Sequence, residues 1–108
     1  VFLKNKDRFL NQFSNSKHNV VKLGLITIYF DFLNHFEEKE VSKIKTIVLN
    51  WTKNSSDWMI LAQGMKLLEK LSKSDKSLKL KLIEVAKRLK NDERKVVRTK
   101  AQKILEDN

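Results

Sequence analysis

The sequence contains no cysteine and no proline, and only two of its 108 residues are glycine. Without cysteine the chain can form no disulfide, no thiolate metal site and no thiol nucleophile. We therefore expect a reducing compartment and a cytoplasmic protein. Proline and glycine are the residues that most often mark turns and break helices, so their scarcity favours long, uninterrupted helices.

Long hydrophobic runs are missing as well. The most apolar stretch, residues 20–33, is interrupted by Lys22 and Asp31 and is too short to cross a bilayer. No signal-peptide arrangement opens the chain, and we expect no association with a membrane. Because residue 1 is Val and not Met, we also consider a fragment or a processed product, with further repeats upstream.

Charge of one sign dominates the composition. The chain has 23 Lys and Arg against 13 Asp and Glu, a net charge of +10. Such an excess attracts nucleic acid, acidic proteins or anionic lipid. A compositional bias toward Lys and Asn produces the same excess without any selection for binding, so both interpretations stay open. With 41% hydrophobic and 33% charged residues, the chain suits one globular domain over residues 1–108.

Apolar residues recur at helical spacing along the whole chain and predict six helices. The first covers about residues 2–13 and the second about residues 16–33. The second is apolar nearly all round, which is typical of a helix buried on several sides. We expect it to lie centrally or to be covered by a further part of the protein.

Polar clusters separate the remaining helices. Acidic residues at positions 37–40 open the third helix, residues 54–57 form the turn and cap of the fourth, and residues 72–77 precede the fifth. Asn91 and Asp92 are expected to cap the sixth. The expected core positions of the third, fourth and fifth helices are Val41, Ile44, Ile47, Val48, Trp51, Ile60, Leu61, Gly64, Leu67, Leu68, Leu71, Leu78, Leu82, Val85, Ala86 and Leu89.

The six helices repeat one two-helix pattern. Shifts of 40 and 37 residues align the second, fourth and sixth helices, and two shifts of 38 align the first, third and fifth. The first pair of shifts superposes Gly24, Gly64 and Ala101, small residues at which packed helices can approach closely. Most of the other superposed positions are apolar, including Val20, Ile60 and Val97, then Ile28, Leu68 and Leu105, and in the other set Phe13, Trp51 and Leu89.

The last unit resembles a HEAT repeat. Asp92, followed by Val97 and Arg98, matches the family's Asp and Val-Arg positions, and the period of 37 to 40 residues suits HEAT-type or armadillo-type arrays. In the family, Asp and Arg of neighbouring repeats commonly form a hydrogen-bonded ladder. The match is partial, because the family's favoured proline is missing and the other units have different residues at these positions, Ser55 and Leu61 in the second and Asn15 and Val21 in the first.

This resemblance implies an all-α fold, a right-handed α-α superhelix of three HEAT-like hairpins with six helices. The repeats would cover about residues 1–36, 37–73 and 74–108. The second helix of each hairpin would line the inner, concave side. A plain six-helix bundle is the alternative.

Residues for catalysis or metal binding are few. His18 and His35 have no Cys and no regular carboxylate spacing around them, and a metal site needs three or four convergent ligands. No glycine-rich phosphate loop exists, and the many Ser and Asp residues fall in turns, where capping explains them. We expect no catalytic residues, no metal and no cofactor.

One polar and aromatic group suggests a different function. Trp51, Asp57 and Trp58 flank the same turn. Some alkylpurine DNA glycosylases are built from HEAT-like repeats and use Trp and Asp side chains in a basic groove, so the chain is loosely similar to these DNA alkylation repair proteins. Trp51 also falls on the expected core stripe, which favours a packing role for it, and the function of a fold does not transfer by itself.

Basic residues indicate the candidate binding surface. Lys66, Lys70 and Lys73 form a stripe on the fourth helix, and the repeat alignment places Lys66 beside Lys103. On the inner side of the array these cations could hold phosphates or a partner's carboxylates, with strong salt dependence; a solvated face that keeps an apolar array soluble is the alternative. The candidate residues are Lys66, Lys70, Lys73, Arg98, Lys100, Lys103 and Trp58.

Three functions are compatible with this sequence. The first is a non-catalytic HEAT-like scaffold that binds a protein partner with an acidic surface. The second is a nucleic-acid-binding protein related to the glycosylases named above. The third is a structural piece of a larger solenoid, whose uncapped ends would expose core surface.

Overall fold

The computed structural model describes residues 17–107, and the regular elements of this part of the chain are all helices, as the sequence predicts. The helix predicted for residues 2–13 lies outside the described residues. No helix within residues 17–107 has both the length and the apolar character that spanning a membrane requires. The elements, in chain order, are α2 (Asn19–Asp31), the short 3-10 helix η3 (Leu33–His35), α3 (Glu38–Asn54), α4 (Trp58–Leu71), the short 3-10 helix η4 (Ser72–Ser74), α5 (Lys76–Leu89) and α6 (Lys95–Glu106).

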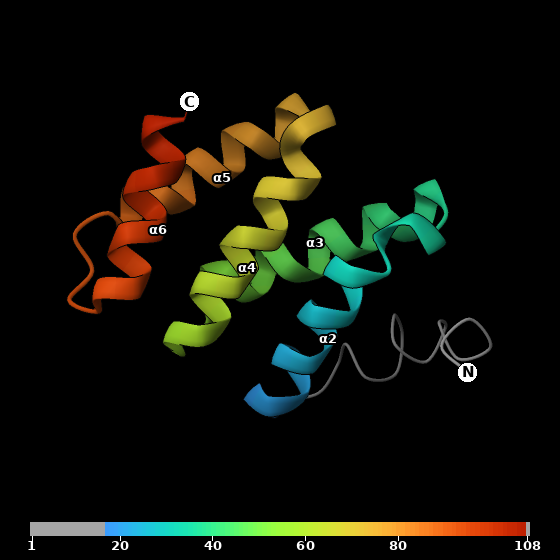
Figure 1. Ribbon diagram of the computed structural model, residues 1–108, viewed down its shortest axis with the longest axis horizontal. Helices are drawn as coiled ribbons and strands as arrows, with labels where there is room; N and C mark the ends of the chain where they lie inside the picture. Colours follow the sequence, from blue (N-terminus) through green and yellow to red (C-terminus); the bar gives the residue numbers. More distant parts are fainter. Residues whose placement is uncertain (1–16, 108) are drawn as a thin grey trace.

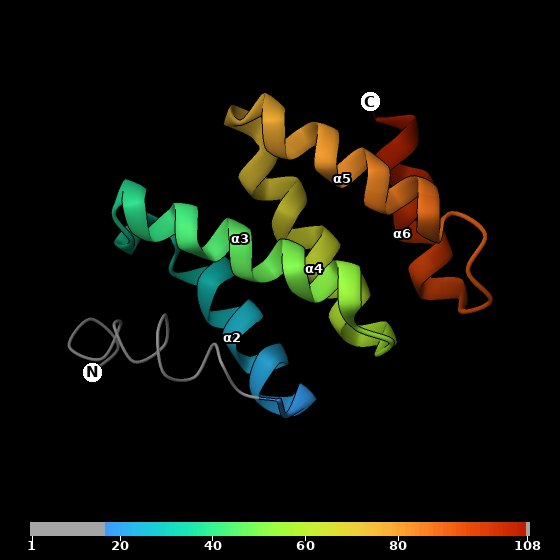
Figure 2. The same cartoon turned by 180° about the vertical axis from the view of Figure 1, so that it is seen from behind.

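The helices form two layers. In Figure 1, α2, α4 and α6 lie side by side with their N-terminal ends at the lower edge, and α4 contacts both of its neighbours. Figure 2 shows α3 and α5 on the opposite side, packed against each other and against α4. Each of the hairpins α3–α4 and α5–α6 therefore contributes one helix to each layer.

Polar residues begin three of the helices, as expected. The backbone N–H of Glu37 donates to the carboxylate of Glu40 at 2.8 Å, which closes the start of α3. The carboxylate of Asp57 accepts the N–H groups of residues 59 and 60 in α4, and Asp75 accepts the N–H of Leu78 in α5. These side chains satisfy donors that the first turn of a helix leaves without partners.

The predicted cap of the last helix is wrong. The residue before α6 is Arg94, which makes no side-chain cap, and the helix begins at Lys95, three residues after Asp92. The carboxylate of Asp92 is occupied differently, because it accepts the backbone N–H and the guanidinium of Arg94 at 2.9 Å each. Asp92 therefore orders the loop before α6 and leaves the first turn of the helix uncapped.

The centre of the core is α4. It contacts α2, α3, α5 and α6, and five of its side chains are fully buried: Ile60, Leu61, Met65, Leu67 and Leu68. The predicted core of α5, from Leu78 to Leu89, is buried in full. Among the described helices α2 lies at an edge, and its buried side chains are Leu25, Ile26 and Tyr29. It is thus not central among these helices, and the alternative expectation, that a further part of the protein covers it, stays a prediction.

Of the four predicted shifts, the one between the first and third helices lies outside the described residues, and burial follows two of the other three. The shift of 38 residues pairs buried positions of α3 and α5, and the shift of 37 pairs buried positions of α4 and α6. The paired positions are Ile44 with Leu82, Val48 with Ala86, Trp51 with Leu89, Ile60 with Val97, Gly64 with Ala101 and Leu67 with Ile104.

The shift of 40 residues between α2 and α4 is wrong. Val20, which this shift places in the core, is 82% exposed, and Gly24 is exposed. A shift of 39 fits the burial, since it pairs Ile26 and Tyr29 with the fully buried residues 65 and 68 of α4. Gly24 is therefore not the counterpart of Gly64; Leu25 is.

Gly64 marks a close approach of α3 and α4. A Cβ atom at this position would lie 2.5 Å from Cγ2 of Thr52, whereas a Cβ at Gly24 would meet nothing within 4 Å. Thr52 has little room to move, because it is fully buried and its hydroxyl donates to the carbonyl of Leu49 at 2.9 Å. The prediction that a small residue is needed at this level is confirmed for Gly64.

We expect Gly64→Ala to be less stable than Gly24→Ala, although both replace a helical glycine by alanine. Alanine favours a helix over glycine by about 1 kcal/mol, so Gly24→Ala should raise the free energy of unfolding. At Gly64 the new methyl group collides with Thr52, and we expect this variant to be about 1–3 kcal/mol less stable than Gly24→Ala. Urea unfolding of both variants measures the difference, and equal stabilities would contradict the close approach.

Candidate interaction surface

The solvent-facing side of the layer formed by α2, α4 and α6, hereafter the α2–α4–α6 face, carries most of the predicted binding residues. A helix returns to the same side after seven residues, so each of the three helices shows one exposed residue near its start and another seven residues later. The pairs are Val20 and Thr27 on α2, Met59 and Lys66 on α4, and Val96 and Lys103 on α6.

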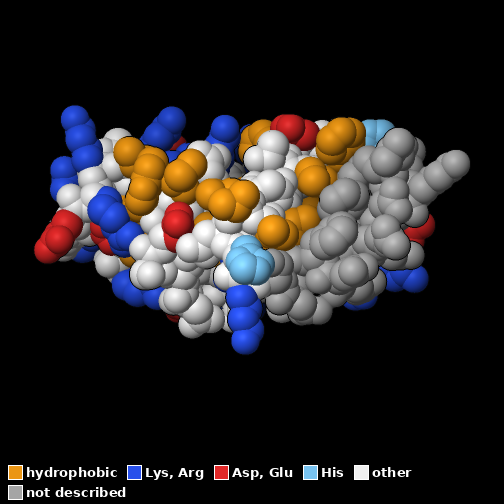
Figure 3. All heavy atoms as spheres, turned by 90° about the horizontal axis from the view of Figure 1, so that it is seen from below, with side chains coloured by type: hydrophobic (Ala, Val, Ile, Leu, Met, Phe, Trp, Pro, Cys, Tyr) orange, Lys and Arg blue, Asp and Glu red, His pale blue; other side chains and the backbone are white. Residues whose placement is uncertain are grey.

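The first members of these pairs form an apolar row along the N-terminal ends of the helices. Val20 is 82% exposed, Met59 is 42% exposed and Val96 is 53% exposed. Trp58, a predicted binding residue, is the first residue of α4 and is 44% exposed beside this row. Figure 3 views these helix ends and shows hydrophobic side chains in a band across the molecule. The sequence prediction included Trp58 but missed the other three.

The second members give the face a cationic row, made of Lys66 and Lys103, both exposed. The ammonium of Lys66 lies 4.9 Å from the ring centroid of Phe30 in α2. Lys70, one turn further along α4, lies 4.2 Å from the same centroid and donates to the carbonyl of Phe30 at 3.1 Å. The two predicted lysines of α4 are thus held beside α2 while their charges remain at the surface.

The other predicted cations are not equivalent to these. Lys100 forms an ion pair with Glu69 of α4, so its charge is neutralised between the two helices. Arg98 lies about 140° around α6 from Lys103 at 3.6 residues per turn, and it donates to the carbonyl of Asp92 at 3.2 Å. Lys73 is exposed in η4, beyond the end of α4. The structure therefore brings Lys66, Lys70 and Lys103 to one surface and directs Arg98 elsewhere.

A small depression separates α2 from α4 on this face. It has a volume of about 130 Å³, too little for a sizeable ligand, and lies next to the cationic row. Its lining is mixed in polarity and consists of Ile26, Thr27, Phe30, Asp31, Gln63 and Lys66. A depression of this size suits one or two side chains of a partner.

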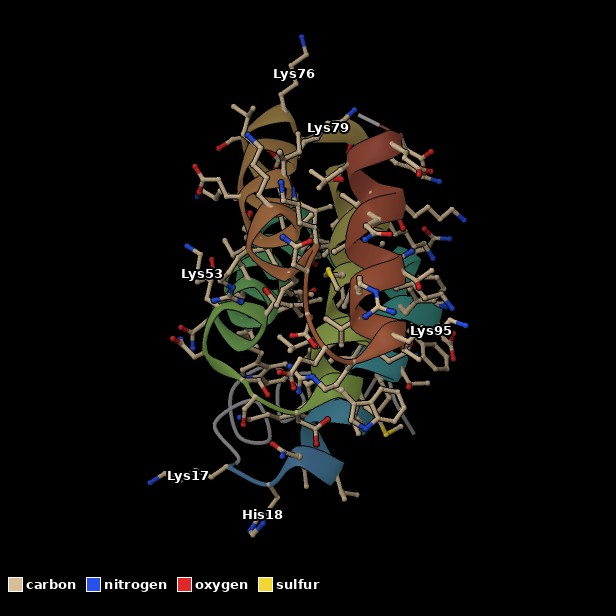
Figure 4. The ribbon with its side chains drawn as sticks, turned by 90° about the vertical axis from the view of Figure 1, so that its left-hand side faces the viewer. Lys17, His18, Lys53, Lys76, Lys79 and Lys95 are labelled. Carbon is tan, nitrogen blue, oxygen red and sulfur yellow. The ribbon has the colours of Figure 1, made fainter. Side chains whose placement is uncertain are left out.

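Positive charge also covers the opposite layer. Helix α5 has five basic residues and one acidic residue, Glu84. In Figure 4, Lys53 and Lys76 extend from the side of α3 and α5, whereas Lys95 extends from the side of α6. The cations of residues 17–107 are thus distributed over both layers and are not collected in one groove that contains Trp58.

Of the three residues on which the similarity to DNA glycosylases rests, Trp51 and Asp57 make structural contacts and Trp58 is exposed. Trp51 is buried in the core, with the ammonium of Lys22 5.8 Å from its ring centroid. Asp57 caps α4 and also accepts the side-chain amide of Asn19 at 3.3 Å. Of the two Trp side chains, Trp58 is exposed to solvent and Trp51 is not. Burial of Trp51 confirms the packing role that its position on the core stripe predicts.

Histidine and carboxylate groups do not gather in the described structure. Within residues 17–107 no three His, Asp or Glu side chains are placed to hold one metal ion. His18 precedes α2 and His35 ends η3, at opposite ends of the same helical segment.

Two arginines that the sequence reasoning did not single out link neighbouring hairpins. The guanidinium of Arg88 in α5 donates to the carbonyls of Thr52 and Lys53 in the last turn of α3, the latter at 2.7 Å. The last carbonyls of a helix have no partner within the helix. Arg88 therefore caps α3 from the next hairpin. The one signal for this contact in the sequence is that Arg88 is a cation in the last turn of its own helix.

Arg94 makes the second link. It binds Asp92 through two guanidinium nitrogens and also donates to the carbonyl of Ser56 in the α3–α4 turn. At the same edge, the side-chain amide of Asn19, at the start of α2, donates to the carboxylate of Asp57, which caps α4. The HEAT resemblance implied a ladder through Asp92 and Arg98; the contact between hairpins is made by Arg94 instead. The short spacing of Asp92 and Arg94 in a loop is the signal that could have indicated it.

Comparisons with known proteins identify no relative. No protein-family model, no curated protein and no solved structure matches the chain. Its function must therefore be inferred from the surface and the packing described above.

We expect Asp92→Asn to lower stability in a pH-dependent manner. Hydrogen bonds from the side chain and the backbone N–H of Arg94 lower the pKa of Asp92 to about 2. In an unfolded chain the pKa of Asp is about 3.9. A carboxyl whose pKa is lower in the folded state stabilises the fold above the unfolded pKa and loses this effect as the pH falls toward the folded pKa. The stability gap between the wild type and Asp92→Asn should therefore be full at neutral pH and close between about pH 4 and about pH 2.

Urea unfolding at several pH values measures this gap. The matched control is Glu93→Gln, which removes one negative charge from the adjacent, exposed residue and leaves the hydrogen bonds of Arg94 to Asp92 and Ser56 in place. We expect this control to be close to the wild type at neutral pH. A gap for Asp92→Asn that is the same at every pH would show that the ion pair with Arg94 does not contribute.

Proposed function

We propose that this protein is a non-catalytic HEAT-like repeat module that acts as a scaffold for a protein partner, which it binds on the α2–α4–α6 face. The observation that supports this most directly is the apolar row, in which Val20, Met59 and Val96 are exposed next to Trp58. Single exposed apolar residues are ordinary, but a row of them bordered by charge is typical of protein–protein interfaces.

The packing supports a repeat architecture. Buried positions recur after 37 to 39 residues, alternate helices form two layers, and polar contacts of Asn19 and Arg94 join successive hairpins at the same edge. We infer from these features a right-handed α-α superhelix of HEAT-like hairpins, with six helices when residues 1–16 are included. The α2–α4–α6 face would be the basic inner surface of this superhelix.

The described polar groups also favour binding over catalysis. Asp57 and Asp75 hold backbone N–H groups at the starts of helices, and Asp92 holds Arg94. Each of these carboxylates has a structural task. The pKa of Asp75 is lowered by its hydrogen bonds from Lys45 and Leu78, so it is ionised at neutral pH, which suits a structural ion pair.

Nucleic-acid binding, in the manner of HEAT-like DNA glycosylase relatives, is the second candidate function. The observation that favours it is the excess of cations on α5, which contains five basic residues and one acidic residue. A surface of this kind attracts any polyanion through counterion release, and the attraction weakens steeply with salt. A phosphate backbone offers no apolar surface that could cover the apolar row, and we therefore place this function second.

Site-specific photo-crosslinking tests the first function. A benzophenone amino acid replaces either Met59 on the α2–α4–α6 face or Leu80 on α5, which at 66% is the more exposed of the two. We expect discrete protein adducts in cells from position 59 and none from position 80. Equal adducts from the two positions would remove the face from consideration, since collision alone would explain them.

Titration of fluorescent duplex and single-stranded DNA separates the two functions. One double variant, Lys66→Glu with Lys103→Glu, reverses charges on the α2–α4–α6 face, and the matched variant, Lys79→Glu with Lys87→Glu, reverses the same number on α5. We expect binding only at low salt and an equal loss in both variants, as for non-specific attraction. Binding that persists at physiological salt and is lost only in the α5 variant would favour the second function.

A further inference from the structure

We infer that the α2–α4–α6 face binds an amphipathic helix that has an apolar stripe beside an acidic one and lies across α2, α4 and α6. This inference rests on the proposed function and names the class of partner. It follows from the distance between the apolar row and the cationic row and from the length of the apolar row, whereas the proposed function uses only the presence of the apolar row and its charged border.

The spacing of the two rows matches the width of a helix. Met59 and Lys66 are seven residues apart on α4, as are Val96 and Lys103 on α6. At a rise of 1.5 Å per residue the rows are separated by about 10 Å, and a helix with its side chains is about 10–12 Å wide. A single helix lying between the rows therefore reaches both of them with opposite flanks.

The length of the apolar row sets the length of the partner helix. Packed neighbouring helices lie about 8–10 Å apart, so the distance from Val20 through Met59 to Val96 is about 16–20 Å. A helix of about 12 residues is about 18 Å long. Apolar side chains at positions i, i+3 or i+4, and i+7 then fall along the row, with Trp58 at its border.

An extended segment fits this face less well. Successive side chains of a strand point to opposite sides, so a single strand directs only one line of side chains to a surface. It could satisfy the apolar row or the cationic row, whereas a helix directs one stripe to each. The depression between α2 and α4, at about 130 Å³, accommodates one additional side chain of the partner at the border of the cationic row.

The charge of the face selects an acidic partner. Among the described residues, neither Lys66 nor Lys103 is paired with a carboxylate, while Glu69 between them is neutralised by Lys100. Asp31 lies at the α2 end of the cationic row. The carboxylates of the partner are therefore expected over α4 and α6, and its uncharged end over α2. This complementarity guides the orientation of the helix as well as its rate of association.

Designed peptides test this inference with the full chain. The probe is a helical peptide of about 15 residues with leucines along one stripe and glutamates along the adjacent stripe. Two controls have the same length: a scrambled peptide of identical composition, and a peptide with lysine in place of every glutamate. Fluorescence anisotropy measures affinity, and amide chemical-shift changes of the labelled protein locate the site.

We expect the acidic amphipathic peptide to shift resonances of Met59, Lys66, Val96 and Lys103 and to bind at least about tenfold more tightly than either control. Lys66→Glu with Lys103→Glu should weaken binding by about tenfold or more, and Met59→Ser with Val96→Ser should do so without changing its salt dependence. Reversal of Lys79 and Lys87 on α5 is the matched control and should change affinity little.

The inference is overturned if the acidic peptide does not bind up to millimolar concentration, if the scrambled peptide binds equally well, or if the resonance changes are confined to α5. Self-association of the chain through the same face would also overturn it, and sedimentation of the Met59→Ser, Val96→Ser variant against the wild type detects this. The proposed function fails separately, because crosslinking from position 59 does not depend on the form of the partner. If position 59 gives protein adducts but the acidic peptide does not bind, the proposed function stands and the inference fails. The partner would then present a surface other than an acidic amphipathic helix.

Discussion

The packing of α4 against every other described helix is the constraint on which the structure depends. Its side chains Ile60, Met65, Leu67 and Leu68 are fully buried, and Gly64 lets the backbone of α3 approach where a methyl group would collide with Thr52. Because α2 and α6 pack on the two sides of α4, their exposed residues face the same direction as those of α4. The existence of one shared surface across three helices is thus a consequence of the burial of the middle one.

Polar contacts between hairpins act at the ends of helices, where the apolar core does not reach. Arg88 binds the last carbonyls of α3, and Arg94 joins Asp92 to the turn before α4. These groups lack partners inside their own helices, so a cation from the next hairpin satisfies them without competing with a helical hydrogen bond. The core fixes the distance between layers, and these contacts fix how successive hairpins are placed along the edge.

Most of the helices could be predicted from the sequence because their apolar residues mark one side. Helix α5 shows this well, since all five residues expected in its core are buried. Helix α2 has apolar residues all round, so periodicity could not tell the exposed Val20 from the partly buried Val21, and the alignment with α4 was wrong by one residue. Helical spacing also placed Lys66 and Lys103 on one surface. Their difference from Lys100 depends on Glu69, which lies 31 residues away along the chain and becomes a neighbour only through packing.

The net charge of +10 is therefore a poor guide to the proposed binding surface. Lys45 and Lys100 are neutralised by Asp75 and Glu69, and Arg88 is occupied by carbonyl groups of α3. The cations that remain are spread over both layers, and an excess of charge alone does not distinguish the layers from each other. The apolar row does distinguish them, because exposing Val20, Met59 and Val96 to water is unfavourable, and the proposed partner on the α2–α4–α6 face would relieve this cost. On both α4 and α6 the exposed apolar residue precedes a lysine by seven residues, so the two lie on the same side of the helix. This arrangement assigns the nearby charge to the α2–α4–α6 face, which the composition alone cannot do.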